Sequence, residues 1–316
     1  MKLEKRQTTT LNLKPCSMTS FSHLNEIFYG IACYEQNSQN EYIGEIIITK
    51  SSDLSEIKKI PTNGGVFRIY SLLKENSIFA VTTSGDFIFI NNETFNVKVI
   101  SNPDKPYFTD GSVSTNYLAA TDDKGNLHLI DRQTQLPIMK VRAHRLRKVG
   151  DLECPAWSCT WINECSLVSV GDDGRCCLWD LRESNLKESL FIQGSTDDGM
   201  VFVSSKQDNI ISVGDYAQNY CLYDLRSTTK MPIITKAFPG GVWHIDSSIE
   251  SSHNLSAAAC MQGGVIVFNN NSEMDIVAHD PNSSLTYGVA IHEDLNGLVV
   301  AEVEFDAKKL NRYSLV

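Results

Sequence analysis

The sequence predicts an all-β protein, a seven-bladed β-propeller, and two observations lead to that prediction. Similar segments recur along the chain at intervals of roughly 40 to 49 residues, which suits a four-stranded propeller blade. In each copy, apolar and polar residues alternate after a cluster of Gly, Asp or Asn, as they do in a β-hairpin. We therefore expect residues 1–316 to form a single β-propeller domain.

Two near-copies of one segment are the clearest evidence for the repeat. The first, GDDGRCCLWDLR, contains Asp180, and the second, GDYAQNYCLYDLR, contains Asp224, which lies 44 residues later. Weaker copies end near Asn91, Asp131 and Asn269. One further period in each direction reaches Ile48 and Tyr313, which makes seven blades.

The segment from Thr8 to Leu13, TTTLNL, is a spare strand that precedes the first blade. The last blade, in contrast, ends abruptly at Val316. A blade sheet left incomplete would expose a bare strand edge, which invites aggregation. We therefore predict that this N-terminal strand completes the last blade and closes the propeller.

Composition and charge exclude several classes of protein. The chain is 42% hydrophobic and 21% charged, which suits a globular domain, and its net charge of -10 argues against a surface that neutralises nucleic-acid phosphates. The one basic run, from His144 to Lys148, is explained by a solvated loop. No apolar stretch is long enough for a signal peptide or a membrane span. We expect a cytoplasmic monomer that binds neither nucleic acid directly nor a membrane.

The nine cysteines are odd in number and include no CxxC pair. This pattern disfavours both a disulfide framework and a zinc site. We expect reduced thiols, no metal and no cofactor.

The Trp179-Asp180 pair, with Asp173 six residues before the tryptophan, resembles the WD-repeat pattern. In that pattern the earlier aspartate braces a turn through hydrogen bonds. The second copy has Ala217 at the position of Asp173. Asp172 and Asp173 are therefore expected to be structural, although paired carboxylates could also serve acid-base chemistry.

The loops that lead into the first strand of successive blades carry the candidate functional residues. Loops at equivalent positions of a propeller converge on one rim, so residues far apart in sequence can share a pocket. His279, Ser284 and His144 are the candidates for catalysis, because they include the residue types of a nucleophile and its base. The candidates for substrate binding are Asp172, Gly240, Gly241, Trp243, His244 and Tyr287.

Several of these candidates have a structural alternative. A single histidine near a strand end, such as His144 or His279, is usually a hydrogen-bonded structural residue. The Gly240-Gly241 pair allows close backbone approach or positive φ, but GGVFRI at Gly64 repeats the pattern 176 residues earlier, four periods of 44. The repeat alone therefore explains part of this motif.

Segments between Val141 and Gly288 together resemble the diphthine methyl ester esterase family, WD-repeat proteins of the diphthamide pathway that act on elongation factor 2. The resemblance depends on PGGVW followed by AACMQGG, and on the stretch from His279 that ends SLTYG. The family pattern has Arg where this chain has His244, and an Asp-Trp pair where it has Val289 and Ala290.

This resemblance implies a hydrolase that removes the methyl ester from methylated diphthine on elongation factor 2, a late step of diphthamide biosynthesis. The implied partner is elongation factor 2 carrying methylated diphthine. This substrate bears a quaternary ammonium group, which suits the aromatic faces of Trp243 and Tyr287 and the carboxylate of Asp172. Replacing Trp243 with Ala is expected to abolish activity and leave the fold intact. The alternative is a noncatalytic scaffold for protein-protein interaction, because propellers host many functions.

Overall fold

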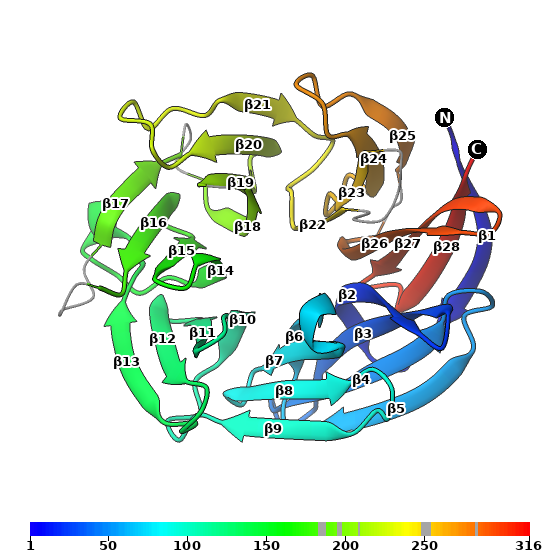
Figure 1. The fold of residues 1–316 in the computed structure, drawn as a ribbon, viewed down its shortest axis with the longest axis horizontal. Helices are drawn as coiled ribbons and strands as arrows, with labels where there is room; N and C mark the ends of the chain where they lie inside the picture. The colour runs from blue at the N-terminus through cyan, green and yellow to red at the C-terminus, as the bar shows by residue number, and fades with distance from the viewer. Residues whose placement is uncertain (183–187, 195–197, 208, 248–253, 282–283) are drawn as a thin grey trace. The chain divides into compact units, whose positions relative to one another are not determined.

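Seven four-stranded antiparallel sheets, the blades of a β-propeller, make up the fold (Figure 1). The structure is a computed structural model that describes residues 1–182, 188–194, 198–207, 209–247, 254–281 and 284–316. It confirms the predicted fold class. The chain divides into two compact units, the first comprising residues 1–100 and 243–316 and the second residues 101–242.

The first unit contains four blades. One blade consists of β2 (Lys14–His23), β3 (Glu26–Gln36), β4 (Tyr42–Lys50) and β5 (Glu56–Thr62). The next consists of β6 (Val66–Leu72), β7 (Ser77–Thr82), β8 (Asp86–Asn91) and β9 (Val97–Ser101), with the short 3-10 helix η1 (Leu73–Glu75) between β6 and β7. The others are β22 (His244–Ser247), β23 (Leu255–Ala259), β24 (Val265–Asn269) and β25 (Ile276–Asp280), and β26 (Thr286–Asp294), β27 (Gly297–Glu304), β28 (Lys309–Leu315) and β1 (Leu3–Thr10).

The second unit contains three blades. Its first blade consists of β10 (Phe108–Val113), β11 (Tyr117–Asp122), β12 (Asn126–Asp131) and β13 (Pro137–Arg142). The next consists of β14 (Ala156–Asn163), β15 (Ser166–Gly171), β16 (Arg175–Asp180) and β17 (Glu188–Gln193). The last consists of β18 (Met200–Gln207), β19 (Ile210–Asp215), β20 (Asn219–Asp224) and β21 (Ile234–Ala237). A second 3-10 helix, η2 (Arg147–Val149), precedes β14.

Each copy of the predicted repeat covers the same part of its blade, the third strand and the turn before it. The five clearest copies end at the last residue of the third strand of their blades, in β8, β12, β16, β20 and β24. The turn before that strand needs a residue with positive φ, which glycine adopts without steric cost. Gly125 (φ 82°) and Gly174 (φ 66°) occupy this turn position, whereas Gln218 (φ 71°) occupies it in the second near-copy.

The N-terminal strand completes the last blade, as predicted. β1 pairs antiparallel with β28, with Thr8 opposite Asn311, and the Thr8 hydroxyl donates to the Asn311 side chain at 2.8 Å. Lys2 and Val316 exchange two backbone hydrogen bonds, so the two ends of the chain lie side by side (Figure 1). The strand begins and ends earlier than the predicted Thr8 to Leu13 segment.

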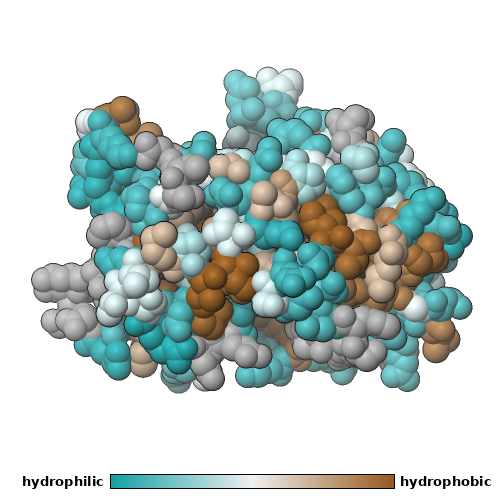
Figure 2. Space-filling model, turned by 90° about the horizontal axis from the view of Figure 1, so that it is seen from above, coloured by the Kyte–Doolittle hydropathy of each residue, from teal (hydrophilic) through white to brown (hydrophobic). Residues whose placement is uncertain are grey.

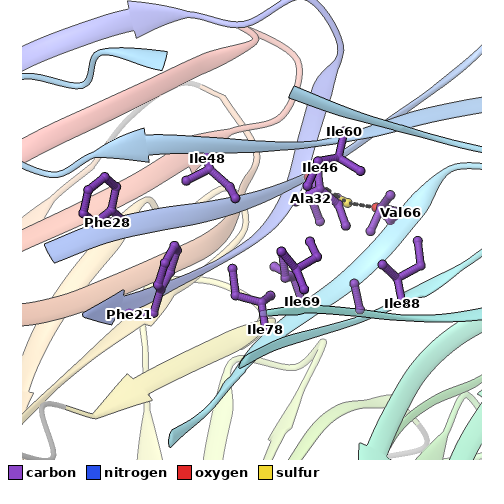
Figure 3. Close-up of a cluster of buried hydrophobic side chains, with 13 residues drawn as sticks. Phe21, Phe28, Ala32, Ile46, Ile48, Ile60, Val66, Ile69, Ile78 and Ile88 are labelled. Atoms are coloured by element: carbon purple, nitrogen blue, oxygen red, sulfur yellow. Dashed lines mark hydrogen bonds between the residues drawn. The ribbon is translucent and has the colours of Figure 1, made fainter. Parts of the chain in front are cut away.

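Apolar side chains fill the space between neighbouring blades. Ile46, Ile47 and Ile48 of β4 are consecutive and all buried, because both faces of this blade are covered. Figure 3 shows one such cluster, which includes Phe21, Phe28, Ile46, Ile69, Ile78 and Ile88. The Cys16 thiol lies in this cluster and donates to the carbonyl of Val66 at 2.9 Å. All nine cysteines are free.

Hydrogen bonds from backbone to side chain also join the first strands of neighbouring blades. In each unit, a Ser or Asp on one first strand accepts a backbone N-H from the first strand of the next blade. The pairs are Ile69 with Ser17 (3.4 Å), Cys159 with Asp110 (3.3 Å), Val203 with Ser158 (3.3 Å) and Ile291 with Asp246 (2.9 Å). These bonds satisfy strand-edge donors that would otherwise be buried without a partner.

The visible surface in Figure 2 is mostly hydrophilic, with hydrophobic residues in separate patches. None of the helices in the described ranges is long and apolar enough to span a membrane.

Replacing Asp110 with Ala should lower the free energy of unfolding by about 2 to 4 kcal/mol, because it leaves buried donors without an acceptor. Asp110 is fully buried and accepts from the Ser158 hydroxyl at 2.6 Å as well as from the Cys159 amide. Chemical denaturation measures the change, and Asp110→Asn, which retains one acceptor oxygen, should lose less. Equal stability of Asp110→Ala and the unmodified protein would contradict the structural role of Asp110.

Candidate functional site

Five aromatic side chains, one or two from each blade of the first unit, gather at one end of these blades. Phe67, Trp243 and Tyr287 lie where the first strands β6, β22 and β26 begin. Tyr34 and Phe305 lie where the second strands β3 and β27 end. In an antiparallel sheet, the start of one strand and the end of the next strand lie at the same end of the sheet. The fold therefore places all five rings together. We call them the aromatic cluster.

The aromatic cluster forms a closed circuit of ring contacts. The ring centroids of Trp243 and Tyr287 are 4.7 Å apart, and those of Tyr287 and Phe305 are 5.1 Å apart. Phe305 lies 5.4 Å from Tyr34, Tyr34 lies 5.5 Å from Phe67, and Phe67 lies 6.3 Å from Trp243. All five separations are in the range preferred by aromatic pairs. The circuit therefore presents several aromatic faces and edges in one place.

The members of the aromatic cluster differ in their exposure. Trp243 and Phe67 are only 4% and 6% exposed, whereas Tyr34, Tyr287 and Phe305 are partly exposed. Any ligand would therefore meet the latter three rings first.

A buried cation lies against Trp243. The guanidinium of Arg68, which is fully buried, is 4.8 Å from the Trp243 ring centroid and donates to the Trp243 carbonyl at 3.2 Å. One face of this ring is thus already in a cation-π contact.

The polar groups of the aromatic cluster are two phenols and the buried indole N-H of Trp243, and an exposed ion pair lies beside the cluster. Burial raises the pKa of both Tyr34 and Tyr287, and the negative charge of Asp306 adds to each increase. Both phenols are therefore protonated at neutral pH and can donate hydrogen bonds. Asp306 pairs with Lys14 at 3.1 Å, and the Lys14 ammonium lies 4.9 Å from the Phe305 ring centroid.

Among the predicted residues of the first unit, Trp243 and Tyr287 are brought into direct contact. His244 follows Trp243 and is also buried, with its ring 6.4 Å from that of Tyr70. Burial, together with the nearby charge of Arg68, lowers the pKa of His244 to about 3. His244 is therefore neutral and is enclosed by the fold rather than presented to a ligand.

His279 and Ser284 are each held by a backbone group. His279 lies on the outer strand β25, and its Nε2 donates to the Gly263 carbonyl at 2.8 Å. The Ser284 hydroxyl accepts the backbone N-H of Ala307 at 3.3 Å. Within the described ranges, no hydrogen bond joins His279 to Ser284.

In the second unit, His144 belongs to a buried chain of hydrogen bonds. Its Nδ1 is 2.8 Å from Asp173 and its Nε2 is 2.8 Å from the Ser169 hydroxyl, which also accepts from the Trp179 indole at 2.9 Å. The side chain of His144 is fully buried. Both ring nitrogens of His144 have hydrogen-bond partners within the fold, which favours the structural alternative for this residue. The bond to Asp173 supports the expected role of that aspartate in bracing a turn.

Asp172 is partly buried beside this chain of hydrogen bonds and accepts a hydrogen bond from the Trp157 indole. Burial raises the pKa of Asp172, and the charge of neighbouring Asp173 adds to the increase. Gly240 and Gly241 are buried between β21 and β22, and neither is among the glycines with positive φ. The glycine pair therefore does not use the unusual backbone geometry that its sequence allows.

Sequence reasoning missed Tyr34, Phe67, Phe305, Arg68 and Asp306. One signal was present, because aligning GGVFRI with GGVWHI places Phe67 at the position of Trp243 and Arg68 at that of His244. The structure places these equivalent segments in contact through the Phe67 and Trp243 rings. Tyr34 and Phe305 belong to less regular parts of the repeat, and no motif marked them.

Comparison with known proteins finds a distant relative. The chain is similar to a diphthine methyltransferase homolog of Dictyostelium discoideum, with 23% identity over 265 residues. The similarity covers 74% of this chain and 71% of the relative. No family model matches the chain.

Among the described residues, no group of three or more His, Cys, Asp or Glu side chains is arranged to hold a metal ion.

Replacing Trp243 with Ala should lower the free energy of unfolding by about 3 to 5 kcal/mol, as for other buried aromatic residues. Its burial thus revises the expectation that this variant leaves the fold intact. Chemical denaturation of Trp243→Ala and Trp243→Phe measures the effect, and the Phe variant should be more stable than the Ala variant. A change below about 1 kcal/mol for Trp243→Ala would show that this ring is not a core residue.

The lowered pKa of His244 predicts a loss of stability in acid. The unfolded chain binds a proton below about pH 6.5, whereas the folded protein does not until about pH 3, so stability falls across this window as pH falls. Between about pH 7 and pH 5, the unmodified protein should lose about 2 kcal/mol more than His244→Gln. Denaturation at these two pH values tests this, and parallel losses in the two proteins would refute it.

Proposed function

We propose that this protein removes the methyl ester from methylated diphthine on elongation factor 2, and that the aromatic cluster receives the modified histidine. The observation that carries the proposal is the circuit of five aromatic rings, three of them partly exposed, beside the Asp306 carboxylate. The similarity to the diphthine methyltransferase homolog, and the family resemblance of the sequence, favour the same substrate class.

The quaternary ammonium group of the substrate suits this surface. Aromatic faces attract such cations through the electron-rich centre of the ring. Tyr34, Tyr287 and Phe305 are the accessible rings. The Lys14 ammonium lies 4.9 Å from the Phe305 centroid and pairs with the Asp306 carboxylate, so we expect Tyr34 and Tyr287 to receive the cation. Arg68 already occupies one face of Trp243, so the substrate would contact the accessible rings and not that face.

Hydrolysis then requires a water molecule and stabilisation of the oxyanion. Water attacks the ester carbonyl carbon, the bond from this carbon to the methoxy oxygen breaks, and methanol leaves together with a free carboxylate and a proton. In our proposal the Tyr34 and Tyr287 hydroxyls, which are protonated, donate hydrogen bonds to the developing oxyanion. Asp306 accepts the proton of the attacking water.

A noncatalytic scaffold is the second candidate, and a specific observation favours it. The three residues expected to act in catalysis, His144, His279 and Ser284, are all held by hydrogen bonds within the fold. A propeller that only binds diphthine-bearing elongation factor 2 would need the aromatic cluster but no nucleophile.

Incubation of the full chain with methyl-esterified elongation factor 2 should release methanol and lower the mass of the factor by one methylene group. Intact mass spectrometry measures this without any added cofactor. An unchanged mass together with stable binding would support the scaffold. If elongation factor 2 with unesterified diphthine gains mass only when a methyl donor is added, the result would instead support the methyl transfer named for the relative.

The two phenols provide the sharper test. Tyr34→Phe and Tyr287→Phe should each lower kcat by about 10- to 1,000-fold, because each removes one oxyanion donor and retains the ring. Tyr117→Phe, which removes a hydroxyl from a tyrosine stacked on Trp161 in the second unit, is the matched control and should leave kcat unchanged. Equal activity of all three variants would exclude the proposed role of the two phenols.

A further inference from the structure

The second unit contains a cavity of about 510 Å³ whose lining includes four basic side chains. Its walls include the cationic side chains of Arg145, Arg147, Lys148 and Arg175, together with apolar Leu146 and Val149. We propose that this basic cavity binds an organic oxyanion, meaning a phosphate or carboxylate group carried on an apolar body. This site is separate from the ester chemistry proposed above, and its test requires no catalysis.

A short structured loop builds one wall of the basic cavity. Between β13 and β14 the chain folds back on itself, with the Leu146 amide donating to the Leu152 carbonyl at 2.9 Å. The 3-10 helix η2 occupies this loop, and Gly150 ends the helix with φ 85°, a conformation that glycine adopts at low cost. The loop therefore presents Arg147 and Lys148 on exposed positions at the cavity.

The two carboxylates of the lining are engaged with donors of the fold. Asp173 accepts from the backbone amides of Arg145 and Arg175, both at 3.2 Å, and faces the His144 ring. Asp172 accepts from the Trp157 indole. The lining thus carries four cationic side chains and two carboxylates, and Arg145 also pairs with Asp151 at 2.7 Å.

The lining also indicates the chemistry of the ligand. Guanidinium groups bind phosphate and carboxylate oxygens through paired hydrogen bonds, and a lysine adds a mobile positive charge. A cavity of this volume is in the range of small-molecule sites, from about 300 to 1,000 Å³. The side chains of Leu146 and Val149 provide apolar contact for the rest of the molecule, which favours an organic anion over a bare ion.

Isothermal titration of the full chain with phenyl phosphate, benzoate and inorganic phosphate at low ionic strength tests this proposal. Phenyl phosphate or benzoate should bind more tightly than inorganic phosphate, because only these two carry an apolar body. The affinity should fall as salt is added, as for partly exposed charges. Equal binding of inorganic phosphate and the two organic anions would overturn the assignment of an organic ligand.

A pair of double variants locates the binding. Arg147→Ala with Lys148→Ala should weaken binding at least tenfold, because both cations of the loop are removed. Lys124→Ala with Lys140→Ala removes the same charge from exposed positions of the second unit outside the cavity lining and is the matched control. Both pairs lie at exposed positions, and circular dichroism checks that each variant is folded. Equal affinity of the two double variants would overturn the proposed site.

Discussion

The first strand of each blade pairs with another strand on one edge only. The packing of the blades depends on how the backbone N-H groups on its other edge find hydrogen-bond acceptors. Side chains solve this problem in both units. Ser17 and Asp246 accept backbone N-H groups of the next first strand in the first unit, and Asp110 and Ser158 do so in the second. Because an unpaired buried donor is costly, these small polar side chains set the alignment of the neighbouring blades that they join within each unit.

That alignment is also what assembles the aromatic cluster. Its five rings come from segments as distant in sequence as Tyr34 and Phe305, and none of them is close to another in the chain. They meet because the blades of the first unit place the same ends of their first and second strands together. A shift of one residue in the register of a first strand would move its ring to the opposite face of the sheet.

The histidines illustrate how one residue type can have different roles in a repeat fold. His144 stabilises a turn because Asp173 and Ser169 are both placed to bind its ring nitrogens. His279 supports a neighbouring turn through the Gly263 carbonyl, and His244 packs in the interior beside Arg68. The polar groups described at the aromatic cluster include the two phenols, the Arg68 guanidinium and the ion pair of Asp306 with Lys14.

The sequence by itself determined the fold class, the ends of the third strands and the use of the N-terminal strand to complete the last blade. These features depend on local patterns, since the alternation of apolar residues and the turn before Trp179 are encoded within a few positions. Tertiary structure alone decided that Trp243 is buried against Arg68, that Tyr34 and Phe305 join Tyr287, and that His279 bonds the Gly263 carbonyl. Two of these contacts, Arg68 with Trp243 and Tyr34 with Phe305, connect residues more than a hundred positions apart. A single sequence contains no local pattern that specifies which side chains meet across such a distance.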